Sequence, residues 1–152
     1  TDFRSLRFPV VITPTQALEG VTAGLVDIYY NAVTKGKYTQ YLKPNLILPA
    51  VYISDLAYGT AQLLEAKNEQ LNLRIYNVGS CSFSPSQQVA SIQKYIPNFQ
   101  VDYSIDETRQ SIAETWPQSI DDFDARNDWG YEPQYDLDSI TREMIDRIKK
   151  NA

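Results

Sequence analysis

The segment "RSLRFPVVITPT", residues 4–15, decides how the fold of this 152-residue chain is interpreted. Its apolar side chains do not alternate with polar ones, because they stand at Leu6, Phe8, Val10, Val11 and Ile12. A run that is apolar on both faces is typical of a strand buried on both sides of a parallel sheet. The run begins only a few residues after Thr1. What pairs with this strand, and what covers it, is therefore the question that the rest of the sequence has to answer.

Pro9 interrupts this run. Proline has no N–H to donate to a ladder, so it is rare inside a central strand. Ligands of open α/β sheets bind at the carboxyl ends of the strands, where the missing N–H of a proline interrupts no ladder. Pro9 therefore indicates either a ligand site or a simple strand end, and the pattern does not choose between them.

The rest of the chain alternates between strand and helix patterns. The expected order is a strand at 6–12, a helix at 22–36 between Thr22 and Gly36, a hairpin-like segment at 35–45, a strand at 49–53, a helix from Ser54, a strand at 74–78, a helix at 84–96, a strand at 99–103, and helices at 106–116, 121–129 and 137–150. Such alternation favours an α/β fold with a partly parallel sheet. The strands are few for so many helices, which again suggests that strands are missing.

Several helix starts and faces follow from local patterns. Ser84 and Gln87 form a capping box with Pro85 in the first turn. The helix that Ser54 caps is expected to bury Ala57, Ala61 and Leu64.

Composition excludes several classes of function. The net charge is −5 and no basic stripe exists, so nucleic acid and anionic membranes are poor partners. No stretch reaches the roughly 18 apolar residues of a membrane span. The sequence has no histidine, which excludes Ser-His-Asp triads, Cys-His pairs and histidine metal sites. The acidic residues at 121–128 lack the spacing of a calcium loop, so we expect no metal.

A few residues could carry chemistry. Gly20 and Thr22 precede a helix, where free amides can hold an anion, although a plain N-cap is the alternative. Arg109 and Trp116 stand seven apart, on one face of the expected helix. Arg109 could clamp a carboxylate, or could form an ordinary surface ion pair. Cys81 is the only cysteine, and without an electropositive neighbour we expect an inert thiol rather than a reactive one.

Five pieces of the sequence match a known family. They are "LRFPVVI" (6–12), "YYNAVTKGKYTQYLKPNLILPAVYISD" (29–55), "YNVGSCSFSP" (76–85), "DETRQSIAETWPQSIDDFDARNDWGY" (106–131) and "YDLDSI" (135–140), and within the fourth piece "RQSIAETWPQSIDD" (109–122) is the most specific part. In this order they resemble the C-terminal half of an extended short-chain dehydrogenase/reductase of the NAD-dependent epimerase/dehydratase superfamily. Within that superfamily the chain is similar to the short-chain type of L-threonine 3-dehydrogenases, and the resemblance covers nearly all of its length.

The resemblance implies a fold, and it implies which half of the enzyme binds the cofactor and which half binds the substrate. Residues 1–152 would form the last strands of a Rossmann-type sheet and a small α/β substrate-binding lobe. The strand in "LRFPVVI" would be a late strand of that sheet with its neighbours in the absent half, so within this chain it should be an edge strand. The N-terminal half, which binds NAD and carries a Tyr-x-x-x-Lys pair, would be absent, because the sequence contains neither that pair nor a Gly-x-Gly-x-x-Gly motif. The segment expected to lie against the nicotinamide contains Phe8, Pro9 and Val11. The residues expected to contact the substrate are Gly20, Thr22 and Trp116, to which Arg109 is added from its own chemistry.

The chain departs from the family pattern at three positions. Val10 stands where glycine is usual after the proline, Val21 where the first of two threonines is usual, and Ala23 where aspartate is usual. These departures concern the substrate and not the fold.

The activity implied is oxidation of L-threonine to 2-amino-3-ketobutyrate by NAD, with no catalytic residue in this chain, so the chain alone should be inactive. The partners implied are a hydroxyl-bearing amino acid and the N-terminal half, in a parent protein that is a homodimer in the cytoplasm or the mitochondrial matrix. Two alternatives stay open: a nucleotide-sugar epimerase or dehydratase, and a binding protein of the same fold without catalysis.

Overall fold

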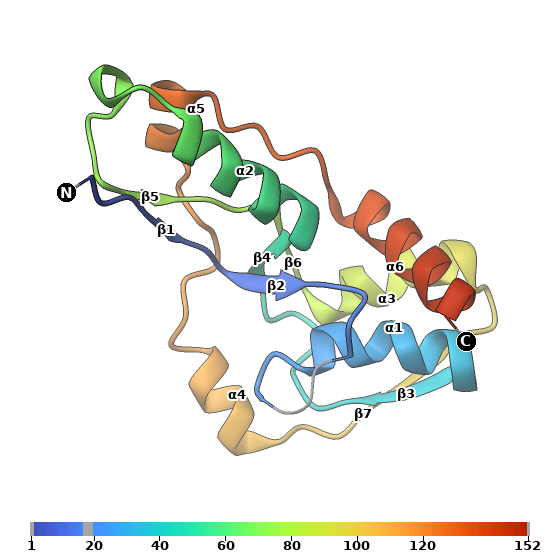
Figure 1. Cartoon of the computed structure of the whole chain (residues 1–152). Helices are drawn as coiled ribbons and strands as arrows, with labels where there is room; N and C mark the ends of the chain where they lie inside the picture. The colour runs from blue at the N-terminus through green and yellow to red at the C-terminus, as the bar shows by residue number, and fades with distance from the viewer. Residues whose placement is uncertain (1, 17–19, 152) are drawn as a thin grey trace.

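The computed structural model describes residues 2–16 and 20–151. Its elements are β1 (Ser5–Arg7), β2 (Val10–Ile12), α1 (Gly24–Lys35), β3 (Lys37–Gln40), β4 (Leu48–Tyr52), α2 (Ile53–Glu65), the 3₁₀-helix η1 (Asn68–Gln70), β5 (Ile75–Asn77), β6 (Cys81–Phe83), α3 (Pro85–Tyr95), β7 (Gln100–Tyr103), α4 (Glu107–Ala113), α5 (Phe123–Trp129) and α6 (Leu137–Asn151). The molecule is elongated, with β1, β5, α2 and α5 towards one end and α1, α3 and α6 towards the other (Figure 1). The expected α/β class with partly parallel pairing is confirmed.

The opening segment forms two short strands rather than one. β1 pairs in parallel with β5, and β2 pairs in parallel with β4. The ladder breaks at Phe8 and Pro9, because proline has no N–H to donate. Within the described residues each of the two strands has a partner on one side only. The expectation of an edge position is therefore confirmed, while the identity of what lies beyond that edge stays a prediction.

The main core surrounds β4, all five residues of which are buried. β4 lies between β2 and β6, and β6 runs antiparallel to it, a strand that the sequence did not predict. Helices α1, α3 and α6 pack together beside this sheet, and their buried side chains include Leu25, Ile28, Tyr29, Ile92, Met144 and Ile145. A second, smaller core at the other end contains Leu63, Tyr76, Val78, Ala125, Trp129 and Tyr131. The main core buries the apolar faces of α1, α3 and α6.

The segment after α1 is not a hairpin, which corrects the prediction for residues 35–45. β3 instead pairs in parallel with β7, with Lys37 opposite Gln100 and Gln40 opposite Tyr103. The pairing extends at both ends through the bonds from Gln100 N to Gly36 O and from Ser104 N to Gln40 O. A parallel partner about sixty residues away leaves no local pattern, so the sequence alone could not show it.

Helix α1 begins differently from the prediction. The residue before it is Ala23, which already has helical angles, and no side chain caps it, so Thr22 is not the N-cap. Tight turns precede the helix, with bonds from Ala23 N to Gly20 O and from Leu25 N to Thr22 O. At the other end Gly36 adopts the left-handed conformation, as predicted. Only the C-terminal boundary was therefore readable from local residue types.

Helix α2 presents a different face from the one expected. It begins at Ile53, so Ser54 is not its N-cap, and it buries Asp55, Gly59 and Leu63. The predicted face is exposed, and Leu64 on it keeps 68 % of its surface. The cause is Asp55, whose carboxylate accepts hydrogen bonds from Ser80 Oγ at 2.5 Å, Gln134 N at 2.8 Å and Tyr135 N at 3.2 Å. Satisfying a buried carboxylate outweighs burying a few apolar side chains.

Helix α4 is shorter than predicted. Asp106 caps it through the backbone N–H groups of Thr108 and Arg109, as expected, but the helix ends at Ala113. Trp116 lies in the turn that follows, where its N–H donates to Ala113 O at 3.2 Å. Arg109 and Trp116 therefore do not share a helix face, which corrects the spacing argument. The capping box of Ser84 and Gln87 at α3 is confirmed.

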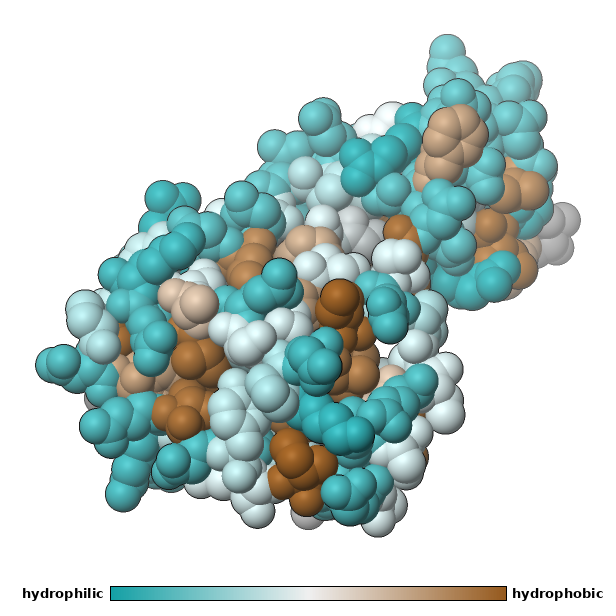
Figure 2. All heavy atoms as spheres, turned by 180° about the vertical axis from the view of Figure 1, so that it is seen from behind, coloured by the Kyte–Doolittle hydropathy of each residue, from teal (hydrophilic) through white to brown (hydrophobic). Residues whose placement is uncertain are grey.

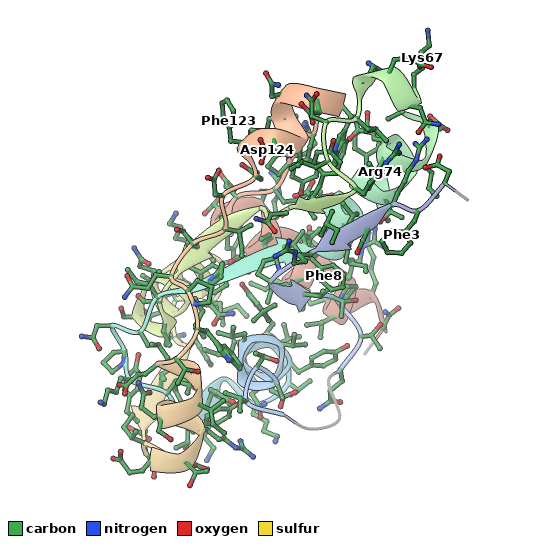
Figure 3. The ribbon with its side chains drawn as sticks, turned by 90° about the vertical axis from the view of Figure 1, so that its left-hand side faces the viewer. Phe3, Phe8, Lys67, Arg74, Phe123 and Asp124 are labelled. Atoms are coloured by element: carbon green, nitrogen blue, oxygen red, sulfur yellow. The ribbon has the colours of Figure 1, made fainter. Side chains whose placement is uncertain are left out.

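The surface along β1 is apolar. Phe3 and Phe8, on either side of β1, are 62 % and 51 % exposed, and Figure 3 labels both. A groove beside them is formed mainly by β1 and α2, with Leu6, Leu56 and Leu64 in its lining. Elsewhere, on the face seen in Figure 2, apolar side chains form separate clusters among polar ones. No helix of the described residues has the length and apolar character needed to cross a membrane.

Replacing Asp55 tests the three hydrogen bonds that its carboxylate accepts and that orient α2. We expect Asp55→Ala to lower the free energy of unfolding by about 2–4 kcal/mol, because three donors lose their charged acceptor. Urea unfolding measures the change, and Asp102→Ala, an exposed carboxylate on β7, serves as the control with an effect within about 0.5 kcal/mol. Equal stability of the two variants would show that the hydrogen bonds of Asp55 contribute nothing to the free energy of unfolding.

Cys81 in β6 is half-buried. Burial, with smaller contributions from the nearby negative charges of Asp136 and Asp55, raises the pKa of its thiol to about 12. A raised pKa keeps the thiol neutral over the whole physiological range, and the neutral thiol is a poor nucleophile. The geometry therefore agrees with the inert thiol expected from the sequence.

We expect iodoacetamide at pH 8 to alkylate Cys81 of the folded protein more than about 100-fold more slowly than it alkylates glutathione. The rate should rise about tenfold per pH unit, with the thiolate fraction, and level off only as the pH approaches 12. Mass spectrometry follows the reaction, and the chain unfolded in urea, where the thiol has its ordinary pKa, is the control. Alkylation of the folded protein at the rate of the unfolded chain would show that the thiol is not shielded.

Candidate functional site

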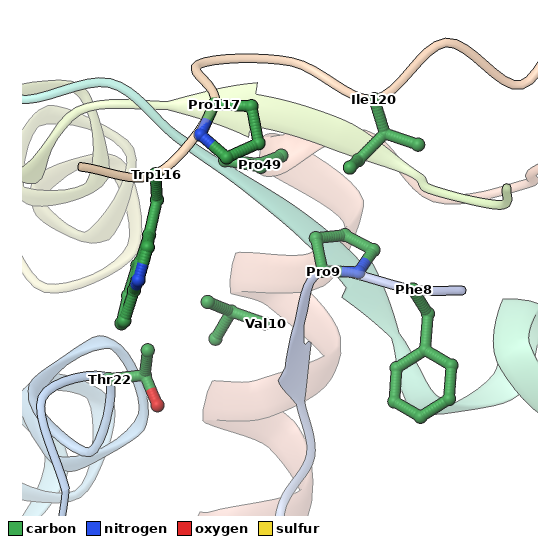
Figure 4. Close-up of a pocket in the computed structure, with 8 residues that line it drawn as sticks. All are labelled: Phe8, Pro9, Val10, Thr22, Pro49, Trp116, Pro117 and Ile120. Carbon is green, nitrogen blue, oxygen red and sulfur yellow. The ribbon is translucent and has the colours of Figure 1, made fainter. Parts of the chain in front are cut away.

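A cavity of about 360 Å³ opens at the point where the opening strand breaks. Its walls come from four segments that are separate in the sequence, and Figure 4 shows them converging. The lining residues are Phe8, Pro9, Val10, Thr22, Pro49, Trp116, Pro117 and Ile120. None of these side chains carries a charge, so a charged group of a bound ligand would be held here by the Thr22 hydroxyl or by backbone groups, while an uncharged flat group could pack on the apolar lining.

The first wall is the break between β1 and β2. Arg7 O still accepts from Val78 N at 3.0 Å, but Pro9 has no N–H to give, so the chain leaves β5 and joins β4 at Val10. This change of partner releases the backbone at Phe8 and Pro9 from the ladder. The Pro9 ring and the Val10 side chain consequently border the open space (Figure 4).

The second wall is the loop before α1. Thr22 lines the cavity from this loop, whose backbone turns tightly from Gly20 to Ala23. Gly20 has a φ of 133°, a left-handed value that side chains rarely adopt, which explains a glycine at this position. Its carbonyl accepts from Ala23 N at 3.3 Å. The loop is thus shaped by backbone bonds and presents one hydroxyl, that of Thr22.

The third wall follows α4. The indole of Trp116 extends from its turn towards Thr22, on the opposite side of the cavity from Pro9 (Figure 4). Pro117 and Ile120 continue the same wall, and Pro49 of β4 completes it. Pro117 explains why no helix continues through Trp116, because the residue before a proline is disfavoured in the helical region.

The structure brings together only part of the predicted set. Phe8, Pro9, Thr22 and Trp116 all line the cavity. Val11 lies in β2 next to it, and Gly20 lies in the loop beside Thr22, but neither is among the lining residues. Arg109 does not line the cavity either: its guanidinium lies over the ring of Tyr41, 4.5 Å from the centroid, and 3.5 Å from Asp106.

Sequence reasoning missed four lining residues, which are Val10, Pro49, Pro117 and Ile120. Pro117 and Ile120 lie inside the quoted motif "RQSIAETWPQSIDD", so the motif itself was the available signal. Pro49 and Val10 belong to neighbouring strands, and nothing local distinguishes them from ordinary core residues.

A smaller, polar chamber of about 130 Å³ adjoins the cavity and shares Pro49 and Ile120 with it. Ser80, Ser82 and Cys81 line one side. On another side Arg126 donates to both carboxylate oxygens of Asp122, at 2.7 and 2.8 Å. The positive charge in this chamber is therefore already neutralised. Over the described residues no group of acidic or cysteine side chains could hold a metal ion.

Several known proteins are similar to this chain in sequence or in structure. No family model matches the chain. The mitochondrial L-threonine 3-dehydrogenase of Bos taurus is 39 % identical over 145 residues, which are 95 % of this chain and 39 % of the relative. An uncharacterised epimerase/dehydratase of Staphylococcus saprophyticus is 39 % identical over 150 residues, 97 % of this chain and 47 % of the relative.

A solved structure agrees with these sequence relatives. The L-threonine dehydrogenase of Phytophthora infestans superposes with a TM-score of 0.94 at 45 % identity, over 99 % of this chain and 49 % of that one. The chain thus spans less than half the length of the relatives it matches. Over nearly its whole length the chain is therefore similar to the C-terminal half of threonine dehydrogenases of the epimerase/dehydratase type, and its parallel strands agree with that similarity.

Proposed function

We propose that this chain is the substrate-binding half of an NAD-dependent enzyme that oxidises L-threonine to 2-amino-3-ketobutyrate. The observation that carries the proposal is the small, uncharged cavity at the strand break, in a chain whose relatives include threonine dehydrogenases. The volume of about 360 Å³ lies at the lower end of the range for small-molecule sites and suits an amino acid next to one flat ring.

We propose further that an NAD-binding half completes the enzyme. The apolar surface along β1, with Phe3, Phe8 and the groove against α2, is a face that such a half could cover. β1 and β2 also offer unpaired edges within the described residues, and open edges in sheets of this kind are normally paired or covered. The half-length matches support the same arrangement.

The cavity fits one end of NAD. Pro9 and Val10 present flat, uncharged surfaces against which a nicotinamide ring can pack. The described residues around the cavity hold no glycine-rich turn for a pyrophosphate, so they would hold the nicotinamide and leave the rest of the dinucleotide to the other half. In this assignment Phe8, Pro9 and Val11 belong to the cofactor side.

The residues of this chain bind, orient and exclude water. Thr22, with the loop from Gly20, would hold the polar end of the substrate through its hydroxyl and the loop backbone. The Trp116 indole, with Pro117 and Ile120, would cover the substrate and keep water from the reacting carbon. NAD, when bound, supplies the hydride acceptor. The proton acceptor would be the tyrosine of a Tyr-x-x-x-Lys pair in the other half.

A nucleotide-sugar substrate fits the same geometry less well. A diphosphate needs cationic side chains, usually arginine. The main cavity has none, and Arg126 of the adjoining chamber is paired with Asp122. We therefore place the amino acid first. We assign the protein to a reducing compartment, the cytoplasm or the mitochondrial matrix, and a homodimeric parent.

A chimera tests the proposal. Joining these 152 residues to the NAD-binding half of the Phytophthora infestans dehydrogenase should give an enzyme that reduces NAD when L-threonine is added. The chain alone should show no turnover, because it contributes no proton acceptor. Absorbance of NADH measures both. Thr22→Val in the chimera should lower kcat/KM by about 10-fold, the cost of one lost hydrogen bond.

Thr39→Val, at an exposed threonine of β3, is the matched control and should leave the rate unchanged. A chimera that folds and binds NAD but does not oxidise threonine contradicts the substrate. NAD reduction by the chain alone contradicts the assignment of the chemistry to the other half. The reading frame upstream of this segment gives an independent check, since it should encode a Tyr-x-x-x-Lys pair.

A further inference from the structure

Two walls of the cavity are short, irregular segments. The Thr22 wall is the loop at 20–23, and the Trp116 wall is the turn at 113–117. A loop that is held only by its own turns can shift by several tenths of an ångström at little cost. Both walls instead contact one segment between β3 and β4, residues 41–43.

Tyr41 holds the Thr22 wall. Its phenol oxygen accepts from Gly24 N at 2.6 Å and donates to Val21 O at 3.0 Å. These bonds replace the side-chain cap that α1 lacks. A Cβ on Gly24 would come within 2.7 Å of the Tyr41 side chain, so the ring lies directly against this backbone. Burial raises the pKa of Tyr41, which keeps the hydroxyl protonated and able to donate.

The same segment holds the helix that leads to Trp116. Asp106 N donates to Tyr41 O at 3.0 Å, and Lys43 N donates to the buried Oε1 of Gln110 at 2.9 Å. Lys43 Nζ also lies 3.0 Å from a carboxylate oxygen of Glu114. Finally, the Arg109 guanidinium lies over the Tyr41 ring, 4.5 Å from its centroid, a distance at which cation and ring attract. α4 is thus bound to residues 41–43 along its length.

We propose that Tyr41 and Arg109 form a bridge that positions the Thr22 wall relative to the Trp116 wall and thereby sets the width of the cavity. Neither residue lines the cavity, so both are positioning residues. Arg109 is then not the carboxylate clamp that its chemistry first indicated. If the bridge is lost, the walls separate and the substrate binds less tightly, while groups of the other half that carry out the chemistry keep their places.

The kinetic test rests on the proposed function and uses the chain joined to an NAD-binding half. Tyr41→Phe keeps the ring under Arg109 but removes the hydroxyl, and Arg109→Met removes the cation. Both should raise KM for L-threonine about 3- to 10-fold, as expected for one lost contact, with kcat within about two-fold of the parent. Arg109→Lys restores a cation over the ring and should return KM to within about two-fold of the parent.

Matched controls lie on the far side of the main core. Tyr95→Phe removes a hydroxyl that donates to Asp138 at 2.8 Å, and Arg142→Met removes an exposed cation on α6. Neither should change KM. An equal rise of KM in Tyr95→Phe and Tyr41→Phe would mean a general loosening and would overturn the bridge.

Fluorine NMR of protein labelled with fluorotryptophan tests the bridge without any turnover. The Trp116 signal, assigned through Trp116→Phe, should shift in Tyr41→Phe and Arg109→Met, while the signal of Trp129 in α5 stays in place. If the unmutated chain joined to the NAD-binding half does not oxidise threonine, the proposed function fails. The comparison of the Trp116 signals in the variants still decides whether the bridge exists. Folded variants with unchanged KM and an unchanged Trp116 signal overturn it. If Tyr41→Phe does not fold, the Arg109→Met and Arg109→Lys pair decides by the same signal.

Discussion

The missing N–H of Pro9 is the constraint on which the arrangement depends. A continuous strand from residue 5 to 12 would need a donor at this position, and its absence makes the chain change partners from β5 to β4. The two pairings place the small core and the main core at different ends of the molecule. They also free the backbone at the break, which is where the cavity begins. One residue thus separates the strand into two and creates the site between them.

Polar bonds between distant residues then decide how the elements are placed. Asp55 turns α2 so that a carboxylate, rather than the alanine and leucine face, points inward to Ser80 and the backbone at 134–135. Tyr41 supplies the bond that α1 lacks at its start. A buried donor or acceptor without a partner costs as much as several buried methylene groups, so such bonds outweigh weak local preferences.

The predicted parts of the fold and of the site share one property. The capping box at Ser84, the Asp106 cap and the left-handed Gly36 all depend on residues within one turn of each other, and the structure contains each of them. The gathering of Phe8, Pro9, Thr22 and Trp116 followed from resemblance to a family rather than from local pattern. Pro49 gave no local signal, because an apolar residue in a strand looks the same whether it faces a core or a cavity.

The sequence by itself determined the α/β class and the helix ends that local residues mark, such as the start of α3 at Ser84 and the end of α1 at Gly36, because these depend on hydrophobic period and on capping residues within one turn. Only the tertiary structure decided that β3 pairs with β7, that α2 buries Asp55, and that Arg109 lies on Tyr41 instead of in the cavity. Each of these depends on a contact between residues tens of positions apart. The free energy of such a contact is absent from any local window of the sequence, and it is larger than the local preferences that it overrides.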